Sequence, residues 1–413
     1  MDNVALEQIC SHIDSYENEA ISLQQNLTAI PALAPENDGD GEQKKAEFVQ
    51  SYLEQALKCD ELTNYPAPDK RVSSGNRPNI VAKIKGRDPS KTLWIMSHLD
   101  VVPPGELDKW HSNPWEIKVE HGKIIGRGVE DNQQGIVSSF LAVKAFRDTG
   151  LQPQINIGLV LVSDEETGSD YGIQYLLEHH KGIFRKEDLI LIPDAGIADG
   201  TMIEVAEKSI VWLKFRVQGK QTHGSTPDHG VNALKASAHL IVKLNDLYLL
   251  YNTEDAVFDP PMSTFEPTKK EANVPNINTI PGEDVFYFDC RLLPDYDVEK
   301  FQQDVKKICS EIESRHRVSI EITTEQVVVA APPTPSDAAI VKALQRAIYH
   351  ISGKQAQPMG IGGGTVAAFF RNQGFQVAVW ATQDETLHEP NEYVKIENII
   401  HDAKVFAHVA LQI

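Results

Sequence analysis

The stretch that decides the fold lies between residues 92 and 169, where apolar runs meet acidic and histidine residues three times. It contains TLWIMSHLDVV (92–102), GRGVEDNQQG (126–135) and INIGLVLVSDEETGS (155–169). The first and third motifs read as buried strands that end in polar residues, and the second places Asp131 after a glycine-bearing turn. So many ligand-type side chains just past buried strands predict a metal-centred hydrolase site.

Around this stretch, strand patterns alternate with helix patterns, which is typical of an α/β sheet with covered faces. Helical spacing covers 4–27, 43–58, 136–147 and 172–179, and strand-like runs cover 79–85 and 93–97. Ligands of such sheets gather at the carboxyl ends of the strands. We therefore expect His98 and Glu165 to lie at one edge of a sheet in a three-layer α/β/α domain.

The pattern changes after about residue 204. Strand, helix, strand, strand, helix and strand follow at 210–217, 232–250, 262–265, 285–293, 298–314 and 318–322. This order is the split βαβ arrangement of a small ferredoxin-like α+β domain. After the proline-rich linker 331–337, a helix at 338–351 and a strand at 376–382 resume the first pattern. We predict a catalytic domain with a mixed sheet over 1–206 and 327–413, interrupted by an inserted domain over 207–326.

Composition narrows the class of protein. With 39 Lys and Arg against 59 Asp and Glu, the net charge is −20, which argues against a nucleic-acid or anionic-membrane partner. The four cysteines form no CxxC pair, so a structural zinc ribbon and a disulfide framework are not expected. The first twenty residues are polar and acidic, and no run approaches the roughly 20 apolar residues of a membrane span. We expect a cytoplasmic enzyme.

Seven residues could act together in the predicted site: His98, Asp100, Asp131, Glu165, Glu166, Asp194 and His388. Two imidazoles with carboxylates and no thiolate suit zinc or another borderline divalent cation. The charge of the set favours two ions that share an activated water. Because Glu165 and Glu166 are adjacent, one can bind metal while the other takes a proton as general base.

The motifs HLDVV, GRGVEDNQQG, SDEETGS, PDAG, THGSTPDHGVNA, NTIPGE, DCRLLPD, GGGT and HEPNE occur in this order. In this combination the chain resembles the dinuclear zinc exopeptidase and deacylase family. That family includes carboxypeptidase G, acetylornithine deacetylase, succinyl-diaminopimelate desuccinylase, aminoacylase, tripeptidase T and the carnosinase-type dipeptidases. The resemblance extends from about residue 27 to the C-terminus.

The resemblance implies two metal sites per subunit, with Zn²⁺ first and Mn²⁺ or Co²⁺ as alternatives. His98 and Asp194 would bind the first ion, and Asp131 would bridge both ions. Glu166 and His388 would bind the second ion. Asp100 would orient His98, and Glu165 would be the general base.

The resemblance also implies that the inserted domain is a lid through which homodimers form. His223 would stabilise the charge that develops on the substrate carbonyl oxygen, in some members from the partner subunit. Substrate binding would fall to Asn278, Arg291 and the turn of Gly363, Gly364 and Thr365. The nearby His229 does not match a family position.

The predicted reaction is hydrolysis of the amide bond of a dipeptide or small peptide. Asp194 stands where deacylases mostly have glutamate and dipeptidases mostly have aspartate, so the resemblance favours a dipeptidase. An N-acyl-amino-acid deacylase of the acetylornithine deacetylase or desuccinylase type is the alternative. A Rossmann oxidoreductase lacks its nucleotide fingerprint, and a mononuclear protease would need HExxH. A non-catalytic protein of this fold would be expected to have lost a ligand or the base.

Overall fold

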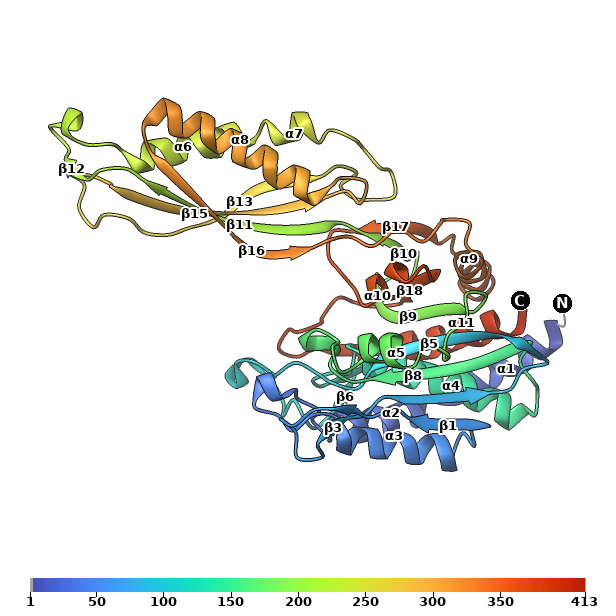
Figure 1. Ribbon diagram of the computed structural model, residues 1–413. Coiled ribbons are helices and arrows are strands. Elements are labelled where there is room, and N and C mark those ends of the chain that lie inside the picture. The colour runs from blue at the N-terminus through green and yellow to red at the C-terminus, as the bar shows by residue number, and fades with distance from the viewer. Residues whose placement is uncertain (1–2, 413) are drawn as a thin grey trace. The chain divides into compact units, whose positions relative to one another are not determined.

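The computed structural model describes residues 3–412, whose contacts divide the chain into two compact units (Figure 1). Unit 1 comprises the chain up to Val205, Thr334–Pro358 and the chain from Phe369 onwards. Unit 2 comprises Ala206–Pro333 and Met359–Ala368. Within the described residues, no helix is both long and apolar enough to cross a membrane.

Unit 1 is built around a mixed sheet with eight strands among the described residues, in the order β1-β4-β8-β5-β9-β18-β10-β17. The strands are β1 (Glu61–Asn64), β4 (Ile80–Ile84), β5 (Asp88–His98), β8 (Ile155–Val162), β9 (Leu189–Gly196), β10 (Met202–Glu207), β17 (Gln357–Ile361) and β18 (Val377–Ala381). The last residues of β10 and β17 are assigned to unit 2. β5 pairs in parallel with β8 and β9, whereas β4 pairs antiparallel with β1 and β8. The expectation of an α/β fold with a large mixed sheet is confirmed.

The central strands bring three distant segments to one edge of this sheet. β8 is buried along its whole length, as is β5 from Thr92 onwards. Parallel pairing sets His98 opposite Val162, so both strands end at the same level. β9 runs parallel to β5 and carries Asp194 near its end. The carboxyl-end rule therefore holds for these three strands.

The helices of unit 1 are α1 (Asn3–Asp14), α2 (Glu17–Thr28), α3 (Gln43–Gln55), α4 (Gln133–Thr149), α5 (Ile173–His179), α9 (Ala339–Ser352) and α11 (Ile396–Gln412), and α10 (Ala367–Asn372) crosses the boundary of the unit. The first turn of α4 packs closely against the ends of β5 and β9. A Cβ at Gly135 would come within 2.8 Å of Ser97 Oγ and 2.7 Å of Pro193 Cγ. Glycine here lets the loop before α4, which contains Asp131, reach the ends of β5 and β9.

A small three-stranded sheet brings a late segment of the chain to the same place. Its strands are β6 (Lys118–Glu120), β7 (Lys123–Ile125) and β19 (Tyr393–Lys395). β19 pairs antiparallel with β7, and Tyr393 lies opposite Ile125. The segment 388–392 before β19 and the segment 126–131 after β7 therefore meet. A two-stranded pair, β2 (Ala67–Pro68) and β3 (Asn76–Arg77), completes the unit.

Unit 2 has a four-stranded antiparallel sheet in the order β13-β15-β11-β16. Its elements are β11 (Ser209–Gln218), β12 (Thr222–His223), α6 (Ala233–Leu244), α7 (Leu247–Leu250), β13 (Thr264–Lys270), β14 (Thr279–Ile280), β15 (Glu283–Leu292), α8 (Val298–His316) and β16 (Ser319–Val328). Alternate residues of β11 and β15, such as Phe215 and Phe286, pack with α6 and α8 in one core. The chain order and the strand order are those of the split βαβ arrangement.

The single helix expected over 232–250 is wrong. α6 ends at Leu244, and α7 begins at Leu247. Between them, Asn245 and Asp246 donate to carbonyls three residues back, which tightens the turn. Asn and Asp have poor helix propensity, and this interrupts the helix although the apolar spacing continues.

Candidate metal centre

His98, the last residue of β5, points its Nε2 atom into a group of carboxylates. Its Nδ1 donates to the Asp100 carbonyl oxygen at 3.0 Å, which leaves Nε2 for the centre. Nε2 lies 2.9 Å from Asp131 Oδ1, 3.6 Å from Asp194 Oδ1 and 4.0 Å from Glu165 Oε2. The imidazole is 2% exposed. His98, Asp131 and Asp194 thus form one group whose ligand atoms converge.

Asp131 also belongs to a second group. Its other oxygen, Oδ2, lies 3.1 Å from His388 Nε2, and Glu166 Oε2 lies 3.2 Å from the same nitrogen. Asp131, Glu166 and His388 thus form another set of converging ligand atoms. The Asp131 carboxylate therefore faces two imidazoles: Oδ1 faces His98, and Oδ2 faces His388.

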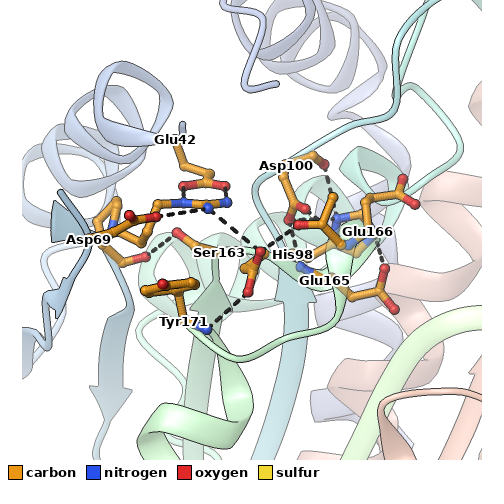
Figure 2. A network of polar contacts seen from close by, with 12 residues as sticks. Glu42, Asp69, His98, Asp100, Ser163, Glu165, Glu166 and Tyr171 are labelled. Atoms are coloured by element: carbon orange, nitrogen blue, oxygen red, sulfur yellow. Dashed lines mark hydrogen bonds and ion pairs between the residues drawn. The ribbon is translucent and has the colours of Figure 1, made fainter. Parts of the chain in front are cut away.

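Asp100 connects the first group to the turn after β8, as Figure 2 shows. Its Oδ1 and Oδ2 accept from the backbone N–H groups of Glu165 and Glu166, at 3.2 and 3.0 Å. Its Oδ1 also lies 3.4 Å from His98 Nδ1. One buried carboxylate thus fixes the histidine ring and the backbone that carries both glutamates.

The turn itself is also held by a buried ion network, part of which is drawn in Figure 2. Asp164 has a left-handed backbone with φ of 66°, and its carboxylate accepts from Thr167 Oγ1 and Tyr171 N. Arg77 Nη1 lies 3.5 Å from Asp164 Oδ1 and 3.6 Å from Asp69 Oδ2. The same guanidinium makes a two-pronged ion pair with Glu42, and both of these side chains are fully buried.

Two further acidic residues link the loop of Asp131 to the loop of His388. The Glu392 carboxylate accepts from the backbone N–H groups of Gly128, Glu130 and Asp131 at 2.9 to 3.1 Å. In return, the Glu130 carboxylate accepts from Asp384 N at 2.7 Å and from both Thr386 N and Thr386 Oγ1. Glu130 and Glu392 are both fully buried. Each loop therefore holds the other in place.

Sequence reasoning missed these two residues, although both lie in motifs quoted for the resemblance. The signal that could have found them is the number of carboxylates, because the predicted roles leave one carboxylate unused in GRGVEDNQQG and two in HEPNE. Arg127, in the same motif as Glu130, was also overlooked. Its Nη1 donates to Glu392 at 2.7 Å, and its Nη2 donates to the carbonyls of His388 and Glu389.

The electrostatics of the centre follow from crowding buried carboxylates around two imidazoles. Burial alone would lower the pKa of His98, but Asp194, Asp100 and Asp131 raise it well above its ordinary value. Asp131 and Glu166 raise the pKa of His388 to about 10. Burial and the neighbouring Asp194 carboxylate raise the pKa of Glu165 well above its usual range. The geometry thus concentrates negative charge around the imidazoles of His98 and His388.

The donor set fits divalent cations. In the described part of the chain, the buried oxygen Oε1 of Glu166 has no hydrogen-bond partner. Such an acceptor is costly unless a cation or a donor occupies its open side. Imidazole nitrogens and carboxylate oxygens without thiolates are the ligands that zinc, manganese and cobalt accept. Asn132 Nδ2, which donates to Pro193 O and Asp194 Oδ1, fixes the outer carboxylate of the first group.

The remaining predicted residues lie in unit 2, in two separate places. His223, in β12, pairs with Thr279 of β14, and its exposed ring accepts from Ser225. The Asn278 carbonyl accepts from Gly224 N, next to this pair. His223 and Asn278 therefore lie beyond the end of the four-stranded sheet at which β15 begins, at Glu283.

Arg291 lies near the opposite end of β15, beside the glycine-rich turn. Its Nη1 donates to Gly362 O at 2.7 Å. Thr365 donates through N and Oγ1 to the buried Glu207 carboxylate, at 3.0 and 2.6 Å. The turn residues Gly363 and Gly364 have open space where a side chain would begin, apart from Glu207 Oε2 at 3.9 Å from Gly364.

Residues 94–412 match the family model described as peptidase family M20/M25/M40. An uncharacterised metallohydrolase of Methanocaldococcus jannaschii is 42% identical over 402 residues, which cover 94% of this chain and 98% of that protein. A succinyl-diaminopimelate desuccinylase of Sulfurovum sp. is 29% identical over 318 residues, 76% of this chain and 82% of that protein. Human carnosine dipeptidase 1 has the same fold, with a TM-score of 0.70, 19% identity and coverage of 98% of both chains.

The matched range includes every residue of the two groups around Asp131. It also covers most of the chain, including both motif-rich parts of unit 1 and all of unit 2. The resemblance drawn from the motifs is therefore confirmed at the level of the family. The chain belongs to peptidase family M20/M25/M40 and is a metallohydrolase that acts on amide bonds.

Proposed function

We propose that this chain hydrolyses the amide bond of a dipeptide or small peptide, with two divalent metal ions and Glu165 as general base. The observation that carries the proposal is the position of Asp131. Its two oxygens lie 2.9 and 3.1 Å from the Nε2 atoms of His98 and His388. A carboxylate that faces two imidazoles in this way would suit a ligand shared by two cations.

His98, Asp131 and Asp194 would hold one ion, and Asp131, Glu166 and His388 would hold the other. Zinc suits this donor set best, with manganese and cobalt as alternatives. When bound, such ions polarise the substrate carbonyl and lower the pKa of water to about 7.

Glu165 suits the role of base because it lies at the margin of the centre. Its carboxylate is 4.0 Å from His98 Nε2 and 19% exposed, whereas Glu166 is 7% exposed and turns towards His388. Asp100 accepts hydrogen bonds from the backbone of both residues. The turn would therefore keep the general base, Glu165, apart from the metal ligand, Glu166. Glu165 would accept a proton from the attacking water and pass it to the leaving amine nitrogen.

The substrate class rests on two features. Asp194 replaces the glutamate that the deacylases of the resembling family mostly have. In unit 2, Arg291 and the turn of Gly363 and Gly364 offer N–H donors that suit the terminal carboxylate of a peptide. An N-acyl-amino-acid deacylase remains the second candidate, because the relative in Sulfurovum sp. is a succinyl-diaminopimelate desuccinylase. Such substrates also carry a carboxylate.

Metal analysis and a substrate panel test the proposal together. Purified protein should contain about two divalent ions per chain, and a chelator should abolish activity that zinc, manganese or cobalt restores. Dipeptides should be cleaved faster than N-acetyl and N-succinyl amino acids under each metal. Preference for the acylated substrates would favour the deacylase, and full activity in the chelated protein would refute both.

Glu165→Gln provides the sharpest single test of the base. The amide keeps the shape of the side chain but cannot accept the proton, so kcat should fall by about 10²- to 10⁴-fold. Bound metal, measured by elemental analysis, should stay unchanged. An unaltered kcat would remove Glu165 from the mechanism, and loss of metal would make it a ligand instead.

A further inference from the structure

The sheet of unit 2 has one face covered by helices and one open face. Residues that point to the helices, such as Val211, Leu213 and Cys290, belong to the core of the unit. Because successive strand residues point to opposite faces, Trp212 and Asp289 point to the open face. They are directly paired across β11 and β15. Trp212 is 41% exposed.

This tryptophan is held in place by a polar contact. Its Nε1 donates to Asp289 Oδ2 at 3.1 Å. Asp289 also accepts from Arg291, through Nε at 2.6 Å and Nη2 at 2.9 Å. The indole and the guanidinium thus donate to the same carboxylate oxygen, Asp289 Oδ2. Trp212 Nε1 and Arg291 Nη2 therefore lie close to each other. A single exposed apolar side chain is ordinary on a protein surface. Trp212 differs because hydrogen bonds to Asp289 hold it next to Arg291.

Arg291 remains able to bind a ligand in this arrangement. A guanidinium carries two N–H groups on each terminal nitrogen. One N–H group of Nη2 donates to Asp289, and one N–H group of Nη1 donates to Gly362 O. One N–H on each nitrogen is therefore left for a carboxylate. The Asp289 charge is balanced by Arg291, so the neighbourhood of the indole has no excess charge from this pair.

We propose that Trp212 is a specificity-determining residue whose indole contacts a large apolar or aromatic side chain on the carbon next to the substrate carboxylate. Asp289 is the positioning residue, because its carboxylate accepts hydrogen bonds from both the indole and the guanidinium and so holds them next to each other. The inference rests on the proposed function, which assigns the terminal carboxylate to Arg291. A side chain on the carbon next to that carboxylate would lie close to the ring, because Trp212 Nε1 and Arg291 Nη2 both donate to Asp289 Oδ2. The substrate class is thus narrowed to peptides whose C-terminal residue is large and apolar.

Steady-state kinetics on Gly-Phe, Gly-Leu, Gly-Lys and Gly-Gly test the inference. The wild type should have its lowest KM for Gly-Phe and Gly-Leu. Trp212→Ala should raise these two KM values about five- to tenfold and leave kcat and the KM for Gly-Gly unchanged. Trp212→Phe should restore most of the preference. Leu249→Ala, which removes a 74% exposed side chain on α7, is the matched control and should change nothing.

Asp289→Asn separates positioning from general destabilisation. It should reduce the preference for Gly-Phe over Gly-Gly, and the double variant with Trp212→Ala should lose no more preference than Trp212→Ala alone. The inference is overturned if Trp212→Ala keeps the wild-type preference. A wild-type preference for Gly-Lys that depends on Trp212 would also overturn it, because the ring would then bind a cation.

A binding measurement distinguishes failure of this inference from failure of the proposed function. If the wild type cleaves none of the peptides, the proposed function fails. Tryptophan fluorescence with added phenylalanine or glycine then decides the role of Trp212. A change with phenylalanine alone, present in the wild type and absent in Trp212→Phe, supports the inference, and any other result overturns it.

Discussion

Glu130 and Glu392 show how much of a metal centre depends on residues that need not touch the metal. Glu392 accepts three hydrogen bonds from the backbone of the loop that contains Asp131. Glu130 accepts three hydrogen bonds from Asp384 and Thr386, in the loop that precedes His388. Glu130 is adjacent to Asp131, and Glu392 lies four residues after His388. The hydrogen bonds of this reciprocal pair therefore help to set the distance between Asp131 and His388.

Glu392→Gln should weaken metal binding by about 10- to 100-fold. A glutamine can present only one oxygen to the N–H groups of Gly128, Glu130 and Asp131, and its own N–H₂ would oppose one of them. Titration of the chelated protein with zinc, followed by calorimetry, measures the change. The exposed Glu389→Gln in the same motif is the matched control. Equal affinities in the two variants would show that the pair does not support the centre.

Arg77→Met should lower the free energy of unfolding by about 3–5 kcal/mol, because Glu42, Asp69 and Asp164 would be left as buried carboxylates without their shared cation. Urea denaturation measures this loss. Arg71→Met is the matched control, since Arg71 binds the same Asp69 but is 42% exposed, and it should cost less than about 1 kcal/mol. A similar loss in both variants would contradict the role of the buried network.

The sequence could predict the residues of the centre because each is a ligand-type residue beside a recognisable strand or motif. His98, Asp131, Glu166, Asp194 and His388 come together as two groups around Asp131, although their roles stay a prediction. The supporting carboxylates could not be predicted in the same way. Their value lies in hydrogen bonds to backbone more than 250 residues away, and no local pattern encodes such a partner.

At the scale of elements, apolar patterns predicted the strands β5 and β8 but missed β10. β10 reads MIEVAE and is buried throughout, although it contains Glu204 and Glu207. Glu204 is matched by two bonds from the buried Arg371 at 2.8 Å. Acidic residues argue against a buried strand unless their partners are known. The partner here lies 167 residues away.

α11 carries a histidine whose environment makes stability depend on pH. His408 is 1% exposed, and its ring lies 5.0 Å from that of His350 in α9. Burial, together with His350 and Arg346, lowers the pKa of His408 to about 4. In the unfolded chain a histidine has a pKa of about 6.5, so the unfolded state binds more protons between these values. Stability from this group is therefore present above about pH 6.5 and is lost as the pH falls towards 4.

His408→Leu should make the free energy of unfolding fall less steeply from pH 6.5 to pH 4.5, by about 2 kcal/mol over that interval. Denaturant curves at several pH values, with chelator present so that metal does not contribute, measure both slopes. The reference comparison of the variant with the wild type is made at about pH 7.5, where His408 of the wild type is neutral in the folded and the unfolded state. Equal slopes would show that α11 tolerates a charged imidazole.

At the scale of the whole molecule, the predicted residues of unit 2 cannot all serve one substrate in one chain. Glu283 and Arg291 are eight residues apart on β15, or about 26 Å, and His223 lies beyond the Glu283 end. An extended dipeptide spans only about 7 Å. If His223 and Arg291 act on the same substrate, they come from two copies of the chain. This reasoning supports the proposed homodimer.

Mixing two inactive variants tests the homodimer. After co-expression with different tags, hybrids of Glu165→Gln and His223→Ala should regain activity, because one of their two sites then combines an intact Glu165 with an intact His223. Each variant alone should stay inactive. No recovery in purified hybrids would mean that His223 serves its own chain, and a monomer in sedimentation analysis would contradict the dimer itself.

The predicted division of the chain stays a prediction, and the division by contacts differs from it. The sequence boundaries at 206/207 and 326/327 lie near changes of pattern, whereas contacts add residues 359–368 to unit 2. That assignment depends on long-range contacts. Lys208 N donates to Ile361 O, and a Cβ at Gly360 would meet the Phe258 ring at 2.3 Å.

This ten-residue segment has a consequence for protein engineering. A chimera that exchanges only 206–333 for the corresponding part of another family member would leave 359–368 from the original chain. The turn at Gly362 and Thr365 would then face foreign residues in place of Arg291 and Glu207. The transferable module is therefore two pieces of sequence, and grafts intended to change substrate preference should carry both.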